Sequence, residues 1–245
     1  PEDFLSWGWR YPFFVVLAIN VVALFARLRL VATPEFERLF ESRELQPSPA
    51  FATMFRERRT IVLGAFAPLA SFALFHMVTV FPLSWVVLFT PEDPVRFLVI
   101  EMIGAAVGVL AIMASGLVAD RLGRRGLLAV SAALIAAYSG FAPQLLNGGD
   151  AGEAAYMIVG FLLLGLAFGQ SSGAIASSFA RNYRYTASAL TSDFAWLFGA
   201  GFAPLAALLL ATHFGLISAG AYLLSGAVWT LLALWLSGLR EAEVN

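Results

Sequence analysis

Long apolar runs alternate with short polar or charged breaks along nearly the whole chain. Seven runs each reach or exceed the about 20 residues that an α-helix needs to cross the hydrocarbon core of a bilayer. Because lipid offers the backbone no hydrogen-bond partners, runs of this length are predicted to form helices and not barrel strands. The predicted spans are residues 11–31, 61–89, 95–118, 126–146, 154–178, 187–212 and 216–238.

The composition strengthens this prediction and excludes other classes of protein. Of 245 residues, 60% are hydrophobic and 13% are charged, whereas a soluble domain is about 45–50% apolar and about 25% charged. The net charge of −1, with no basic stripe, excludes a nucleic-acid-binding surface. The absence of cysteine excludes disulfides, thiolate metal sites and thiol catalysis. The chain is therefore predicted to be an all-α membrane protein with about seven transmembrane helices.

The distribution of arginine predicts the orientation. All fifteen basic residues are arginines, and alternating spans place Arg10 and Arg96 on one side and the other thirteen on the opposite side. The positive-inside rule puts the arginine-rich side in the cytoplasm. Pro1 is then external and Asn245 cytoplasmic. Because residue 1 is proline, the sequence is expected to begin inside a longer protein.

The only sizeable polar segment, residues 32–60, is predicted to be cytoplasmic. Thr33 followed by Pro34 is typical of a helix N-cap with proline at the first helical position. Aromatic residues at helical spacing on both sides of a break at 46–49 predict two short amphipathic helices. They would either lie on the inner membrane surface or tether two bundles.

A charged motif lies between the third and fourth predicted spans, on the cytoplasmic side. Its sequence is Gly116-Leu-Val-Ala-Asp120-Arg121-Leu-Gly123-Arg124-Arg125. Asp120 is expected to pair with an arginine or to cap the next helix, and such contacts could hold one bundle against another in one conformational state. A positive-inside anchor is the alternative, but it does not require the spacing of Gly116, Asp120 and Gly123.

Four polar side chains fall inside predicted spans, where a charge at the helix centre costs roughly 2.5–3.5 kcal/mol. They are His76, Glu101, Gln170 and Asp193. Each is a candidate for proton coupling or for lining a substrate cavity, and structural pairing or packing is the alternative for each. No arginine lies near the midplane of a span, so a zwitterionic solute, with its cationic end on Asp193 or Glu101, suits this chain better than a dicarboxylate.

Small residues and prolines mark further positions of interest. Glycines spaced four apart favour close helix approach, either for sliding or for static packing, and prolines inside spans can break helices beside a substrate path. These positions are Gly104, Gly108, Gly165, Gly169, Gly173, Pro68, Pro82 and Pro204.

One enzymatic motif has to be weighed. The stretch 169–173 matches the Gly-x-Ser-x-Gly pattern of serine hydrolases, which requires a strand–turn–helix elbow that an apolar helix lacks. An intramembrane Ser171–His76 pair is the alternative, and nothing in the sequence orients it. The chain is predicted not to be an enzyme.

Four segments together resemble a known family. The motif at 116–125 is similar to the loop signature of the major facilitator superfamily. Residues 6–13 (Ser-Trp-Gly-Trp-Arg-Tyr-Pro-Phe), 33–36 (Thr-Pro-Glu-Phe) and 179–186 (Phe-Ala-Arg-Asn-Tyr-Arg-Tyr-Thr) resemble segments of its metabolite:proton symporter branch.

The resemblance implies a domain organisation. Residues 1–31 would be an external segment and the last helix of an N-terminal bundle, residues 32–60 the cytoplasmic linker, and residues 61–245 a C-terminal six-helix bundle. Five further helices would precede the chain. Arg184 would assist the cytoplasmic latch formed by the motif.

The resemblance also implies a function. It is proton-coupled symport of a small organic acid or a compatible solute, such as betaine or proline, across the bacterial inner membrane by alternating access. The proton gradient would supply the driving force without a cofactor. The partners would be the lipid bilayer, the solute, the proton and the missing N-terminal helices. The alternative is a truncated, non-transporting remnant of such a permease.

Overall fold

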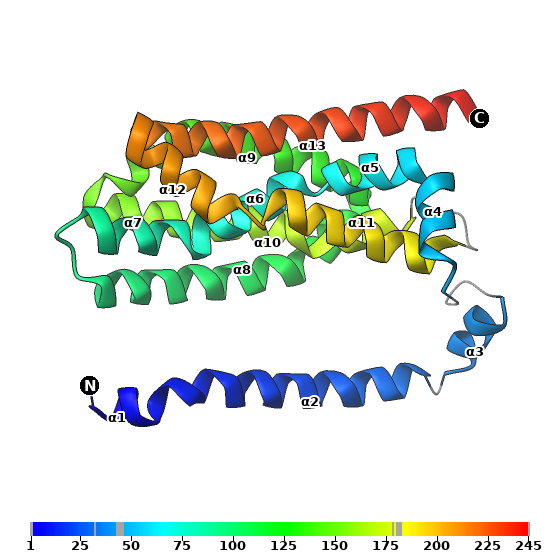
Figure 1. Cartoon of the computed structure of the whole chain (residues 1–245), viewed down its shortest axis with the longest axis horizontal. Coiled ribbons are helices and arrows are strands. Elements are labelled where there is room, and N and C mark those ends of the chain that lie inside the picture. Colours follow the sequence, from blue (N-terminus) through cyan, green and yellow to red (C-terminus); the bar gives the residue numbers. More distant parts are fainter. Residues whose placement is uncertain (1, 32, 43–46, 178, 180–182, 245) are drawn as a thin grey trace. The chain divides into compact units, whose positions relative to one another are not determined.

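The computed structural model describes residues 2–31, 33–42, 47–177, 179 and 183–244, and every regular element in these ranges is a helix (Figure 1). The chain divides into two compact units, one ending at Pro47 and the other beginning at Ser48. Seven segments of the described chain are long and apolar enough to span a membrane, and they coincide with the seven predicted spans.

The first unit contains one candidate span and one short amphipathic helix. Its elements are α1 (Glu2–Ser6), η1 (Gly8–Arg10), α2 (Tyr11–Val31) and α3 (Pro34–Glu41). At the start of α3 the Phe36 N–H donates to Thr33 Oγ1 at 3.3 Å, with Pro34 following the cap. This confirms the predicted N-cap.

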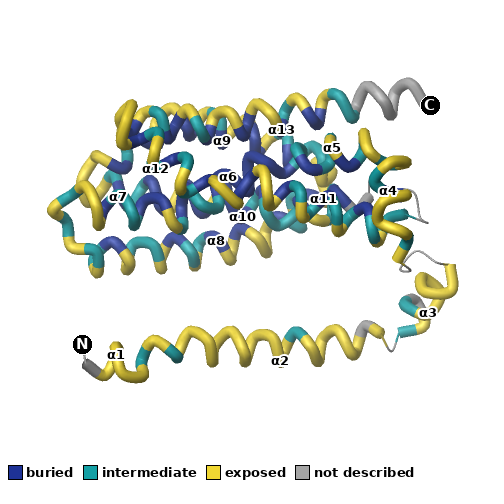
Figure 2. Tube along the Cα trace, in the orientation of Figure 1, coloured by how far each residue is buried: buried dark blue, intermediate teal, exposed yellow. Residues whose placement is uncertain are grey.

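The second unit contains the remaining six candidate spans. Its elements are α4 (Ala50–Arg56), α5 (Arg58–Phe66), α6 (Leu69–Thr79), α7 (Phe81–Phe89), α8 (Pro94–Leu122), α9 (Arg124–Leu146), α10 (Gly149–Ser177), α11 (Arg184–Gly199), α12 (Ala203–Phe214) and α13 (Ile217–Val244). Buried residues concentrate on α6, α9 and α10, whereas α8 exposes much of its surface (Figure 2).

Two of the six spans are interrupted at the prolines that the sequence marked. Pro68 precedes α6, and Pro82 lies in the first turn of α7, so the second span of the chain consists of α5, α6 and α7. Pro204 lies in the first turn of α12 and follows the break between α11 and α12. Proline lacks an N–H group, and its ring clashes with the preceding turn, which is why the helices break there.

Glycine sets the close approach of α8 and α10, which pack against each other. A Cβ added at Gly165 would lie 2.6 Å from the Ala111 Cβ, and one at Gly104 would lie 2.6 Å from a ring carbon of Phe161. Only a residue without a side chain fits at these positions, as the glycine spacing predicted.

The second half of the predicted linker packs on α11. The Ser48 N–H donates to Thr186 Oγ1 (2.8 Å), and that hydroxyl donates to the Ser48 carbonyl (3.1 Å). Thr53, which is fully buried, shares a hydrogen bond of 2.7 Å with Ser48 Oγ. The Arg56 guanidinium donates to the Tyr183 hydroxyl at 2.6 Å. Helix α4 is thus fastened to the first turn of α11.

Candidate functional site

The break between α11 and α12 opens onto a cavity of about 460 Å³. This volume lies in the range of about 300–1,000 Å³ that small-molecule sites occupy. The lining residues are His76 from α6, Asp193, Trp196 and Leu197 from α11, Ala200 and Gly201 at the break, and Pro204 from α12. Irregular backbone at membrane depth is tolerated where it lines a cavity, and interrupted helices form the substrate sites of many transporters.

Trp196 lines this cavity and is supported from behind by other aromatic rings. The Trp196 ring packs against Phe72, Phe75 and Phe168, with centroid separations of 4.6, 5.7 and 6.2 Å. Trp196 is nevertheless 38% exposed, so part of the indole faces the cavity. An indole face attracts cations, and Asp193 lies one helical turn before Trp196 on the same helix.

The two ionisable groups of the cavity differ in their surroundings. His76 contacts Phe75 edge to face at 5.2 Å. Its Nδ1 atom is buried and has no hydrogen-bond partner among the residues that the structure describes. Asp193 is exposed. The cavity is therefore lined by one imidazole ring and one carboxylate.

The other two predicted candidates lie outside this cavity. Gln170 on α10 donates to Ser115 Oγ on α8 at 3.1 Å, beside the glycine contact of these helices. Glu101 on α8 has a buried Oε2 atom with no partner in the described part of the chain. The structure thus brings His76 and Asp193 together and leaves Glu101 and Gln170 elsewhere.

The charged motif forms the tight turn between α8 and α9. Gly123 has a φ of +75°, a conformation that glycine adopts without strain. Asp120 and Arg121 are exposed. Asp120 makes no ion pair within the described residues, and α9 begins after Gly123 without a side-chain cap. Neither of the two contacts expected for Asp120 is therefore present among the residues that the structure describes.

The remaining arginines of the predicted latch are engaged within the second unit. Arg125 donates to the Leu234 carbonyl (2.5 Å) and to Ser237 Oγ (2.7 Å), which ties α9 to α13. Arg124 reaches the Gly173 carbonyl at 3.5 Å, and Arg184 reaches the Phe179 carbonyl at 3.4 Å. Residues 180–182 of the predicted loop segment lie outside the described residues.

Gly116 differs from the other glycines of α8. A Cβ added there would meet nothing within 4 Å, so packing within the unit does not require glycine at this position. Gly116 and Asp120 are four residues apart and share one face of the helix.

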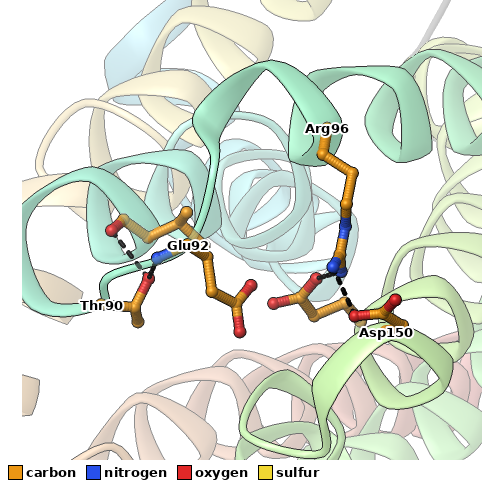
Figure 3. Close-up of polar contacts among 6 residues, drawn as sticks. Thr90, Glu92, Arg96 and Asp150 are labelled. Carbon is orange, nitrogen blue, oxygen red and sulfur yellow. Dashed lines mark hydrogen bonds and ion pairs between the residues drawn. The ribbon is translucent and has the colours of Figure 1, made fainter.

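Sequence reasoning missed an ion-pair cluster at the opposite end of the bundle (Figure 3). Arg96 at the start of α8 pairs with Glu153 at 2.8 Å and also with Asp150, both from the start of α10. The Glu153 side chain is only 1% exposed, and that of Asp150 is 82% exposed. Two acidic residues three positions apart at the start of a helix could have indicated this cluster in the sequence. Their partner Arg96 could not be identified, because it is more than 50 residues away in sequence.

Taken together, the long apolar helices and the open cavity beside an interrupted span define a multi-spanning membrane protein. The chain belongs to the Major Facilitator Superfamily, whose family model matches residues 4–204. This is a family of transporters and not of enzymes, as the sequence predicted.

The chain is similar to several curated bacterial transporters. It is 33% identical to the inner membrane metabolite transport protein YhjE of Escherichia coli over 96% of its length. It is 28% identical to a proline/betaine transporter of Salmonella typhimurium over 94% of its length, and 26% identical to a shikimate transporter of E. coli over 93%. It covers 55%, 48% and 53% of these relatives, so it spans about half their length. No solved structure matches the chain.

Proposed function

We propose that this chain is the C-terminal part of a proton-coupled metabolite symporter of the bacterial inner membrane. The observation that carries the proposal is the cavity at the α11–α12 break, which is lined by the Asp193 carboxylate, the His76 imidazole and the Trp196 indole. The similarity to an inner membrane transporter supports the location, with Asn245 on the cytoplasmic side according to the arginine distribution.

The proposed mechanism is alternating access between two bundles. Asp193 takes up a proton from the external side and releases it on the cytoplasmic side, and the His76 imidazole, which lines the same cavity, contacts the solute or water. A charge enclosed within the membrane is costly. Protonation of Asp193 to its neutral form therefore makes it easier for the transporter to pass through the occluded state. Glu101 and Gln170 remain candidates for a supporting role, since the Glu101 Oε2 is buried without a partner among the described residues.

The proposed solute is small and zwitterionic. The partly exposed Trp196 ring and the Asp193 carboxylate both attract a cationic end, and none of the described arginines lines the cavity to receive a carboxylate. The similarity to proline/betaine transporters supports a compatible solute. The similarity to a shikimate transporter supports an organic acid, which would need its cationic partner from residues outside this chain.

We further propose that Gly116, Asp120 and Arg121 form the surface that meets the N-terminal bundle in one conformational state. The open space at Gly116 and the exposure of Asp120 support this role. Arg124, Arg125 and Arg184 instead shape that surface from within the second unit, through their contacts with backbone carbonyls. The proposed latch thus includes only part of the charged motif.

The test is solute uptake by the complete permease in proteoliposomes with an imposed pH gradient. The panel is glycine betaine, proline and shikimate, and the key variant is Asp193→Asn. We expect this variant to lose pH-driven accumulation, because an amide can neither take up nor release a proton, and to exchange solute with a raised KM, because the cationic end of the solute loses its carboxylate. Asp3→Asn, an exposed residue of α1, is the matched control and should transport normally.

Two outcomes would overturn the proposal. Full pH-driven accumulation by Asp193→Asn would remove the carboxylate from coupling. Absence of uptake of every small zwitterion and organic acid by the wild-type permease would favour a non-transporting remnant.

A further inference from the structure

The span formed by α5, α6 and α7 has two breaks, and the first of them, beside Pro68, contains a side chain from another helix. In a continuous helix the Ala70 N–H would donate to the Phe66 carbonyl. Here it donates to Thr230 Oγ1 of α13 at 2.8 Å, and the Thr230 hydroxyl donates to the Phe66 carbonyl at 3.2 Å. Thr230 is 1% exposed. A buried hydroxyl has thus been inserted into the backbone ladder beside Pro68.

The second break has a similar arrangement, supplied by a different helix. In a continuous helix the Met77 carbonyl would accept the Phe81 N–H. Here it accepts the hydroxyl of Tyr156 from α10. Tyr156 is buried, and its own carbonyl accepts the Tyr138 hydroxyl of α9 at 2.9 Å. A second buried side chain therefore satisfies the backbone beside Pro82.

Between these two breaks lies α6, which carries His76 into the cavity. At each end of α6, a hydroxyl from a neighbouring helix replaces one rung of the helical ladder. A hydrogen bond between a side-chain hydroxyl and the backbone can be broken and re-formed without unwinding a helical turn. A helix with an unbroken series of backbone hydrogen bonds cannot bend sharply in the same place.

We infer that Thr230 and Tyr156 are positioning residues that hold α6 as a hinged segment and thereby set the place of His76 at the cavity. The segment pivots about the two hydroxyls while α5 and α7 keep their packing. The consequence for transport rests on the proposed function. The hinge itself can be tested on the 245-residue chain alone.

The direct test is hydrogen exchange of backbone amides in the purified chain in nanodiscs. Thr230→Val keeps the shape of the side chain and removes the hydroxyl, so we expect the Ala70 amide to exchange about 5- to 10-fold faster. Thr230→Ser keeps the hydroxyl and should restore the wild-type rate within about twofold. Thr191→Val is the matched control, because Thr191 is equally buried but, among the described residues, its hydroxyl bonds only to the Ala187 carbonyl of its own helix.

A second measurement follows the position of residue 76. Since the chain has no cysteine, His76→Cys provides a single thiol for a water-soluble maleimide. Adding Thr230→Val or Tyr156→Phe should change the labelling rate at least about threefold, since either substitution breaks one hydrogen bond that holds α6. Tyr222→Phe is the control for Tyr156, because the Tyr222 hydroxyl makes no hydrogen bond to a described residue.

In the complete permease, the hinge variants should change the KM for the solute more than kcat, and Thr230→Ser should restore the wild-type KM. Unchanged Ala70 exchange in Thr230→Val, or an equal increase in Thr191→Val, overturns the hinge whatever transport shows. Faster exchange together with pH-driven uptake that survives Asp193→Asn upholds the hinge and refutes the proposed coupling. A Thr230→Val chain that fails to fold, with a native-like Thr230→Ser chain that exchanges rapidly at Ala70, also overturns the hinge.

Discussion

Substitution of Gly165 by alanine tests the contact that determines the spacing of α8 and α10. The added Cβ would lie 2.6 Å from the Ala111 Cβ and 3.0 Å from the Ile112 nitrogen. Carbon atoms pack at about 3.5–4.0 Å, so the two helices must separate by about 1 Å. The obstacle includes backbone, which cannot rotate away as a flexible side chain could.

We expect the Gly165→Ala chain to be destabilised by roughly 1–3 kcal/mol, the usual cost of overpacking a core. This loss exceeds the gain of about 0.5–1 kcal/mol that alanine brings to a helix interior. The matched control is Gly140→Ala on α9, where an added Cβ meets nothing within 4 Å. The control should be neutral or slightly stabilised.

The assay is reversible unfolding of the purified chain in detergent, followed by tryptophan fluorescence and circular dichroism. For a chain of 150–250 residues, 1 kcal/mol corresponds to a shift in Tm of about 2–4 °C. If Gly165→Ala were as stable as Gly140→Ala, the close approach of α8 and α10 would not depend on glycine, and the reasoning would be wrong.

Two further predictions concern the two ends of the bundle. Arg96→Gln should lower the Tm more than Asp150→Asn does, because it leaves the Glu153 carboxylate buried without its cation. Adding Glu153→Gln to the Arg96→Gln chain should recover part of the lost Tm. If the Tm changes of the two single variants simply add in the double variant, the pairing is contradicted. Gly116→Val should change the stability of the isolated chain by less than about 1 kcal/mol yet abolish uptake by the complete permease, whereas normal uptake would show that no element approaches this position.

The sequence predicted the spans and their interruptions because both depend on local properties. An apolar run of sufficient length must form a helix in lipid, and a proline inside such a run removes an N–H and clashes with the preceding turn, which favours a kink or a break at that place. Pro68, Pro82 and Pro204 therefore marked the breaks correctly. The glycine spacing on α8 and α10 likewise indicated close approach, since a pattern of small residues along one helix face is visible without knowledge of the partner.

The sequence could name the polar residues of the spans, but only the packing decided which of them meet. His76 and Asp193 are separated by a long stretch of chain and line one cavity, whereas Glu101 and Gln170 lie outside it. The rotation of each helix about its axis decides this, and it follows from the fit of all neighbouring side chains. Arg125 shows the same dependence, because its position in a charged motif gave no sign that α13 would receive it.

The two hydroxyls that enter the breaks before and after α6 are the features that a sequence is least able to predict. Thr230 resembles any threonine of an apolar helix until α13 is placed beside Pro68, and Tyr156 resembles an ordinary core tyrosine until α10 reaches the end of α6. Sequence alone thus determined the class of protein, the spans and the places where helices break, because hydropathy and proline act locally. Tertiary structure decided how those breaks are satisfied, because a hydrogen bond across helices exists only once the helices are packed.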